Sequence, residues 1–303
     1  MTARSFMRGT LWVLVALAFV GHLVGGWHFS NRIIDDAFTP DPGAIVVPSG
    51  DFEIEEVTYQ SELGTFDAWY LPAAGDVWLI HVHGLNGTPA EASPLFAAVQ
   101  AAGYPQLSIT YRNDDNQPAD PSGYHRYGAT EWEDILAAVN HAVSNGAENV
   151  VLAGYSTGAS HVLSFAYRHA FDEIGGIITD SANVDMGSTI DYRGSLEELP
   201  VVPFNVPATV TWVAKFFTSL RIDVNWKSID YIERAKRSLR VPVLAILGDS
   251  DESVPIQQSL DLAAAQPDLV DVLVFEGTGH VASFETDFDR YLSAVIDLLQ
   301  RAG

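Results

Sequence analysis

The pattern of hydrophobic and polar positions changes in a regular way along residues 51–303. Short runs that are continuously apolar, or that alternate apolar and polar residues, have the length and pattern of strands. Longer segments between them repeat apolar residues at helical spacing. The predicted strands are 52–59, 65–71, 77–82, 107–111, 150–153, 176–179, 243–247 and 271–275, and the predicted helices are 90–102, 130–143, 159–170, 256–265 and 286–299.

The order of these segments indicates the fold class. A polar bend at 61–64 joins the first two strands, which predicts an antiparallel pair. After this pair, strands and helices alternate, and such alternation is typical of a mostly parallel sheet with helices on both faces. We therefore predict one α/β domain over residues 51–303, long enough to bury a sizeable core.

Residues 183–240 interrupt the alternation. The segment is predicted to form two or three short helices, and it is rich in aromatic residues. Because it follows a sheet strand, we interpret it as a helical cap over a pocket, where apolar side chains would contact a substrate. A local satellite core is the alternative. The aromatic residues are Tyr192, Phe204, Trp212, Phe216, Phe217, Trp226 and Tyr231.

The N-terminal segment, residues 1–34, has a different pattern. Arg4 and Arg8 precede a stretch, 9–31, that contains no charged side chain. A run of about 18 or more apolar residues is long enough to cross a bilayer as a helix. We interpret it as an anchor that leaves its basic end in the cytoplasm and the rest of the chain outside. A cleaved signal peptide, which would make the protein secreted, and a buried helix of a cytosolic protein are the alternatives. The Pro- and Gly-containing residues 35–50 are predicted to be a linker.

Composition narrows the possible partners. Sixteen basic residues against 39 acidic ones give a formal charge of −23. A nucleic-acid partner is therefore excluded, because contacts to phosphates need a basic face. We interpret the acidity as a solvated surface, with adaptation to high salt as the alternative. The chain has no cysteine, and therefore neither a disulfide nor a thiolate metal site.

Residues 154–158, Gly-Tyr-Ser-Thr-Gly, lie between a predicted strand and a predicted helix. A strand that turns at once into a helix strains the central residue and leaves no room for side chains at Gly154 and Gly158. The pattern predicts an exposed Ser156 at a helix N-terminus, where amide dipoles favour negative charge.

A serine nucleophile needs a base, and the base needs an orienting acid. His280 follows the last predicted strand, at the sheet edge where sites of open α/β sheets form, and we assign it as the base. The other histidines are assigned elsewhere: His22 and His28 to the membrane segment, His141, His161 and His169 to helices, and His125 to a polar loop.

For the acid, the loop 247–255 follows the preceding strand, and we choose Asp251. Asp249 is expected to support this loop by hydrogen bonding. Asp180, at the end of strand 176–179, is the second candidate because it also lies at a carboxyl edge. The order Ser156, Asp251, His280 is the one expected on this architecture.

The loop 83–88 follows the strand 77–82, so its amides can face Ser156. We assign the backbone amides of Leu85 and Thr157 to the oxyanion hole. His81 and His83 alternate at strand spacing, but without a third nearby ligand they do not indicate a metal site.

Together, Gly-Tyr-Ser-Thr-Gly, His-Gly-Leu-Asn-Gly, Asp-Glu-Ser-Val-Pro and Gly-Thr-Gly-His resemble the motifs of the α/β-hydrolase fold superfamily, over roughly residues 52–299. The resemblance implies an eight-stranded sheet, a Ser-His-Asp triad, an inserted cap and no cofactor. The serine argues against dehalogenases and epoxide hydrolases, which use aspartate there. Thr157 departs from the more frequent Met, Leu or Gln, which matters little because its amide supplies the hydrogen bond.

The leading hypothesis is a serine hydrolase that cleaves carboxylic esters of small-molecule acyl substrates. An acyltransferase or a serine peptidase would use the same three residues. A non-catalytic binding protein would keep the fold and use the cap region as its binding surface.

Overall fold

The computed structural model describes residues 3–169, 172–198 and 205–303. Two features predicted from the sequence, the aromatic Phe204 and the helix end at Ala170, lie outside these residues. The described chain forms two compact units, each considered by itself. The sheet unit comprises Pro40–Thr189 and Trp226–Gly303, and the helical unit comprises Met1–Thr39 and Ile190–Asn225.

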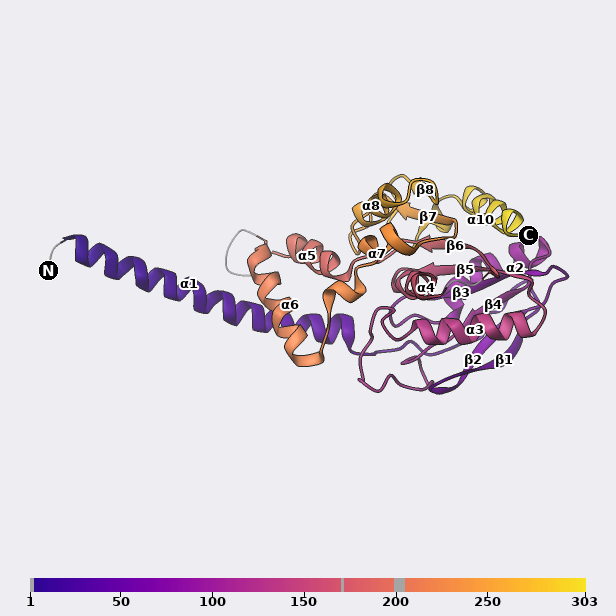
Figure 1. Cartoon of the computed structure of the whole chain (residues 1–303), viewed down its shortest axis with the longest axis horizontal. Coiled ribbons are helices and arrows are strands. Elements are labelled where there is room, and N and C mark those ends of the chain that lie inside the picture. The colour runs from indigo at the N-terminus through magenta and orange to yellow at the C-terminus, as the bar shows by residue number, and fades with distance from the viewer. Residues whose placement is uncertain (1–2, 170–171, 199–204) are drawn as a thin grey trace. The chain divides into compact units, whose positions relative to one another are not determined.

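The sheet unit is built on an eight-stranded sheet of order β1-β2-β4-β3-β5-β6-β7-β8 (Figure 1). The first two strands form the predicted antiparallel hairpin, which closes between Ser61 and Gly64. Strand β2 also pairs antiparallel with β4, and every later pairing is parallel. The predicted mostly parallel α/β sheet is confirmed. The strands are β1 (Glu55–Ser61), β2 (Gly64–Leu71), β3 (Val77–Val82), β4 (Gln106–Ile109), β5 (Asn149–Tyr155), β6 (Ile174–Asp180), β7 (Val243–Gly248) and β8 (Val270–Phe275).

Two hydrophobic layers cover the faces of this sheet. Successive residues of β5 alternate between them: Val150 and Leu152 enter one layer, Val151 and Ala153 the other. The first layer includes side chains of α3 (Trp132–Ser144), α4 (Thr157–Arg168), α7 (Tyr231–Ser238) and α8 (Gln257–Ala265). The second includes side chains of α2 (Ser93–Ala101) and α10 (Phe288–Ala302). Burial on both faces explains why the central strands are continuously apolar.

The structure shifts several predicted boundaries. Strand β1 begins three residues later than the pattern 52–59 indicated, at Glu55, and the C-terminal helix is divided into α9 (Ser283–Thr286) and α10. Predicted helix 90–102 is divided into the 3₁₀ turn η2 (Pro89–Ala92) and α2, which has Pro94 in its first turn. Inside one continuous helix Pro94 would lack the amide that the helical hydrogen bond requires. Such shifts fall at element ends, where hydrogen bonding outside the element competes with the local pattern.

The helical unit contains α1 (Ala3–Ile33), α6 (Ala208–Ile222) and the C-terminal part of α5 (Met186–Leu196). Helix α1 continues as the π-helical turn η1 (Ile34–Phe38), which enters the predicted linker 35–50. Thr10–Phe38 is long and apolar enough to cross a membrane, although a signal sequence has the same properties. Of the predicted insert 183–240, Ile190–Asn225 belongs to the helical unit. The turn η3 (Trp226–Ile229) and α7 belong to the sheet unit, and the role of the insert as a cap stays a prediction.

Candidate active site

Ser156 lies at the turn between β5 and α4, as the sequence pattern predicts. Its backbone has φ 51° and ψ −112°, a conformation that L-residues rarely adopt. The turn is held on both sides, because the Ser156 amide donates to the Asp180 carbonyl (2.8 Å) and the Ser156 carbonyl accepts from the Asn183 amide (3.2 Å). The surrounding hydrogen bonds therefore maintain the strained geometry.

The two glycines of the motif are required by close backbone contacts. A Cβ at Gly158 would lie 2.1 Å from the Val82 carbonyl oxygen, and one at Gly154 would lie 2.6 Å from backbone atoms of Ala159. Neither neighbour is a flexible side chain, so the backbone itself would have to move. The turn is consequently packed directly against the end of β3.

His280 links the nucleophile candidate to an acid. Its Nε2 lies 2.7 Å from Ser156 Oγ, and its Nδ1 lies 2.7 Å from Asp251 Oδ2. When Nδ1 carries the proton and donates to Asp251, Nε2 is free to accept from the serine hydroxyl. The His280 side chain is 27% exposed and that of Asp251 is 2% exposed, so the pair opens to solvent on the histidine side.

Asp251 is fixed in the loop after β7. Its Oδ1 accepts from the amides of Ser253 (2.7 Å) and Val254 (2.9 Å), which leaves Oδ2 directed to His280. Asp249 supports the loop as expected, since its Oδ1 accepts from the Gly277 amide (2.6 Å). The two aspartates thus have different partners although they are two residues apart.

Asp180, the second candidate for the acid, is fully buried at the end of β6. Its carboxylate accepts from Ser181 Oγ (3.1 Å) and makes no hydrogen bond to His280 among the contacts of the described residues. Burial raises the pKa of Asp180 to about 7, against the lowering effect of the nearby Tyr291 and Ser181 hydroxyls. A carboxyl group that is partly protonated near neutral pH is a weak partner for an imidazolium.

The loop predicted to supply an oxyanion donor lies beside the serine. A Cβ at Gly84 would be 3.2 Å from Ser156 Cβ, so only glycine permits this approach without displacing a neighbour. Leu85 follows in this loop, and Thr157 is the first residue of α4. The assignment of their amides to an oxyanion hole stays a prediction.

Three residues that the sequence pattern did not single out hold this loop. Glu91 accepts from the Gly84 amide (2.6 Å), and the Tyr111 hydroxyl donates to the Gly84 carbonyl (3.0 Å). Asp114 lies 2.8 Å from His83 Nε2. Burial disfavours a charged His83, but Asp114 outweighs this effect, and the pKa of His83 is raised. No local pattern marks these residues, since only the fold brings them to the loop.

The other histidines do not form a metal site. Within the described part of the chain, no group of three or more His, Asp or Glu side chains is arranged to hold a metal ion. His81 bonds to Tyr155 (2.9 Å) and Gln106 (3.0 Å), and burial lowers its pKa to about 4. His125 lies 2.9 Å from Asn86 of the loop 83–88, and burial lowers its pKa as well.

Comparisons with known proteins identify the family of the chain. The sequence model of the prolyl oligopeptidase family matches residues 120–302, which is more than half of the chain. The chain belongs to the prolyl oligopeptidase family. It is therefore a member of a serine hydrolase family with the predicted α/β-hydrolase fold. No curated protein matches the chain.

Solved structures with this fold include both esterases and a peptidase. An esterase of Pyrococcus furiosus, Pf2001, is 20% identical with a TM-score of 0.66, covering 87% of this chain and 98% of its own. Esterase RhEst1 from a Rhodococcus species is 18% identical with a TM-score of 0.57, covering 82% and 99%. The acylaminoacyl peptidase of Pyrococcus horikoshii is 17% identical with a TM-score of 0.61, covering 84% of this chain and 42% of its own. At these identities the likeness shows the fold alone.

Proposed function

We propose that this member of the prolyl oligopeptidase family is a serine hydrolase that cleaves carboxylic esters through an acyl-enzyme. The observation that carries the proposal is the continuous hydrogen-bond chain from Ser156 through His280 to Asp251. Each side chain comes from a different loop at the carboxyl edge of the sheet, where sites of open α/β folds form.

In the first step, Ser156 Oγ attacks the acyl carbon of the ester while His280 Nε2 takes the hydroxyl proton. The imidazolium that forms is stabilised by Asp251, which remains ionised. The carbonyl oxygen becomes an oxyanion, and in the proposed mechanism the amides of Leu85 and Thr157 donate to it. When the tetrahedral intermediate collapses, the alcohol leaves with the proton of His280.

In the second step, water takes the place of the alcohol. His280 removes a proton from the water as it attacks the acyl carbon, and the second tetrahedral intermediate uses the same donors. Its collapse releases the carboxylic acid, and His280 returns the proton to Ser156. The proposed reaction uses no metal or cofactor.

We favour esters over peptides because two of the similar structures that match over nearly their whole length are esterases. The two esterases are covered almost completely by this chain, whereas the acylaminoacyl peptidase is covered only to 42%. Peptide hydrolysis is the second candidate, and the match to the prolyl oligopeptidase family favours it.

The test uses the full chain in detergent. Nitrophenyl esters of short and long acyl chains and nitroanilides of proline-containing and N-acylated peptides are offered in parallel. We expect ester turnover that Ser156→Ala abolishes, together with covalent labelling of Ser156 by a fluorophosphonate. Preference for the nitroanilides would favour the peptidase, and absence of labelling in folded protein would favour a non-catalytic binding protein.

We further propose that α1 anchors the protein in a membrane, with the sheet unit on the non-cytoplasmic side. The apolar segment Thr10–Phe38 supports this proposal, as do Arg4 and Arg8 on its short leading side. Retention of the chain in membranes after alkaline extraction would support an anchor. Release of a shortened chain into the medium would show instead that the segment is a cleaved signal sequence.

A further inference from the structure

Helix α6 lies along α1 in the helical unit, and the two helices run in the same direction (Figure 1). The contacts between the two helices follow the same order along both sequences. His22 Nε2 lies 2.9 Å from Thr209 Oγ1, Ser30 Oγ lies 3.1 Å from Thr218 Oγ1, and Arg221 donates to Asn31 (2.7 Å). The second half of α1 is thus paired with most of the length of α6.

Small residues bring the two helices close together. Gly25 and Gly26 of α1 face Val210 and Val213 of α6, and a Cβ at Gly26 would lie 2.3 Å from Val213 Cγ1. Glycines that admit a neighbouring helix, together with hydroxyl and amide side chains that bond across the contact, are typical of helix pairs in membranes. Within the apolar region His22 is paired with Thr209 and Ser30 with Thr218, which suits a surrounding without water.

The outer face of α6 presents large apolar side chains. Trp212 is 67% exposed, Phe216 51% and Leu220 68%, and their spacing of four residues places them on one side of the helix. The rings of Trp212 and Phe216 are stacked at 6.5 Å. We call these three residues the α6 stripe. Exposed aromatic residues in such an arrangement would be costly in water.

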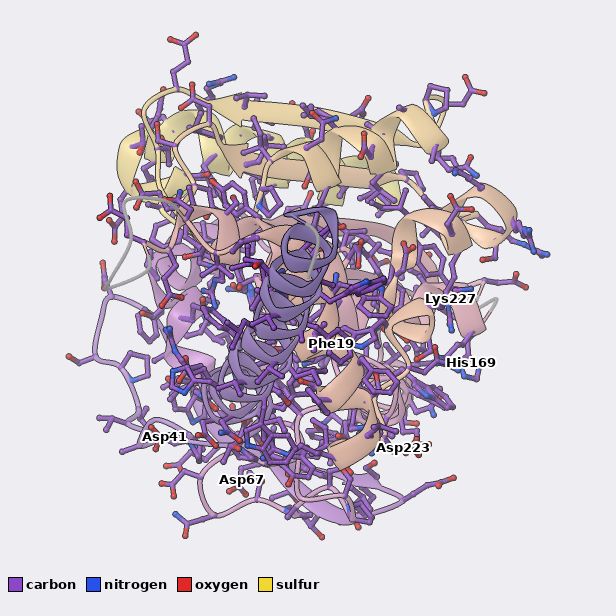
Figure 2. All side chains as sticks on the ribbon, turned by 90° about the vertical axis from the view of Figure 1, so that its left-hand side faces the viewer. Phe19, Asp41, Asp67, His169, Asp223 and Lys227 are labelled. Carbon is purple, nitrogen blue, oxygen red and sulfur yellow. The ribbon has the colours of Figure 1, made fainter. Side chains whose placement is uncertain are left out.

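Helix α1 exposes apolar side chains in the same unit. Leu14 is 58% exposed and Phe19 64%, and Figure 2 labels Phe19 on this helix. Only 6% of the most apolar stretch within Thr10–Phe38 is buried within the chain. The α6 stripe therefore continues an apolar surface that already has the length and composition of a bilayer-spanning segment.

Charged groups lie at the end of the pair where the apolar run stops, and one further charge on α6, that of Lys215, is paired with Asp191 of α5. Arg221 lies over the ring of Trp27 at 4.8 Å and bonds to Ser30 and Asn31, and Arg32 pairs with Glu197. Tryptophan and arginine at this position are typical of the boundary between hydrocarbon and headgroups. In the parallel pairing, the N-terminal end of α6 is then the end that lies deeper.

We propose that the α6 stripe docks into one leaflet of a lipid bilayer alongside α1, so that α6 is held at the membrane by a second contact besides the anchor. The inference rests on the proposal that α1 is a membrane anchor, and it adds a lipid-binding surface on α6. A bilayer is the occupant because the lipid that covers α1 also covers the helix packed along it. Docking of the α6 stripe does not require hydrolysis by Ser156.

The absence of cysteine from the chain provides a direct test. Single variants Trp212→Cys, Phe216→Cys and Leu220→Cys of the full chain are labelled with an environment-sensitive fluorophore and reconstituted in phosphatidylcholine vesicles. Leu14→Cys on α1 reports insertion of the anchor. Ser293→Cys, at an exposed position of α10, is the control for a water-facing helix. Quenching by a shallow acyl-chain nitroxide lipid and by aqueous iodide is measured, with circular dichroism to check folding.

We expect the three α6 labels to be quenched several-fold more by the lipid nitroxide, and several-fold less by iodide, than the label on Ser293→Cys. Iodide quenching equal to that of Ser293→Cys, with Leu14→Cys in lipid, would overturn docking and leave the anchor intact. If Leu14→Cys is also open to iodide, both proposals are wrong. Protection of the α6 labels in detergent that depends on protein concentration would show that a second copy covers the stripe, and would overturn the proposal.

Discussion

Unusual backbone conformations collect around the candidate active site. Ser156, Ser181 and Val281 have φ of 51°, 52° and 51°. A β-branched residue with positive φ is a marked outlier, and Val281 directly follows His280. Its amide donates to Ser181 Oγ (2.9 Å), which in turn donates to Asp180. Individual hydrogen bonds thus hold Ser156, and the residue that follows His280, in conformations that a free chain would avoid.

The acid assignment predicts different effects for two neighbouring aspartates. In Asp251→Asn the amide no longer stabilises the imidazolium and favours the wrong tautomer of His280, so we expect kcat to fall by on the order of 10⁴. Asp249→Asn keeps an oxygen that can accept from the Gly277 amide and is the matched control. Its kcat is expected to stay within tenfold of wild type, because a hydrogen bond that supports a loop typically contributes only ~1 kcal/mol. An equal loss in both variants would contradict the assignment.

Asp180 predicts a pH dependence of stability. Because burial raises its pKa from 3.8 to about 7, the folded chain keeps this proton over a range in which the unfolded chain has lost it. The unfolded state therefore binds fewer protons between about pH 4 and 7, and the free energy of unfolding falls as pH rises through this window, by at most about 1.4 kcal/mol per pH unit.

The measurement is denaturant unfolding of the full chain in detergent across this pH range. Asp180→Asn cannot ionise, so its stability relative to wild type should increase as pH rises. Asp297→Asn, at an exposed position of α10, is the control for the same substitution elsewhere in the sheet unit. Parallel curves for wild type and Asp180→Asn would show that Asp180 does not titrate in this window.

At the scale of elements, the site depends on the long connection from β4 to α3. This segment contains Asp114, which contacts His83, and Arg112, whose side chain is 2% exposed. Arg112 binds both oxygens of Asp134 on α3 (2.7 and 3.0 Å), Asp120 (3.2 Å) and Glu133 (2.9 Å). A buried cation with several carboxylates therefore ties an otherwise irregular segment to a helix.

Removal of this cation should destabilise the sheet unit. Arg112→Met leaves Asp134 and Asp120 buried without their partner, and we expect the free energy of unfolding to fall by about 3–5 kcal/mol. Arg301→Met removes an exposed contact to Asp271 of 3.8 Å and should cost less than about 1 kcal/mol. Denaturant unfolding compares the two variants with wild type. Equal, small effects would mean that water or rearrangement compensates the buried carboxylates.

At the scale of the whole molecule, the charged residues and the long apolar segment lie in different parts of the chain. The formal charge of −23 belongs to a chain with only 16 basic residues, whereas 9–31 carries no charged side chain. Repulsion between like charges destabilises the folded state, and salt screens it. The apolar helix, by contrast, needs a lipid or detergent surrounding at any salt concentration.

The excess of acidic residues predicts stabilisation by salt. Raising sodium chloride from about 0.05 M to about 0.5 M shortens the screening length more than twofold. We expect the midpoint of thermal unfolding in non-ionic detergent to rise by several degrees. A midpoint that falls with salt would mean that ion pairs such as those of Arg112 dominate over the general repulsion.

The sequence alone was sufficient for the alternation of strands and helices, the parallel sheet and the loops from which the three residues of the proposed triad come. Each of these rests on local pattern or on chain order. In a parallel sheet the loops after successive strands meet at one edge, so a serine after β5, an aspartate after β7 and a histidine after β8 are brought near one another by topology. The glycines at 154 and 158 likewise signal a turn by their spacing.

Only the tertiary structure shows that Asp251, rather than Asp180, is hydrogen-bonded to His280, because both aspartates follow strands at the same edge of the sheet. Glu91, Ser181 and Arg112 had no local signal, since their partners are set by packing between separate elements. The same holds for α6, whose contact with α1 spans nearly two hundred residues of chain. Local pattern determines which elements form, whereas the contacts between distant elements depend on shapes that exist only after the chain has folded.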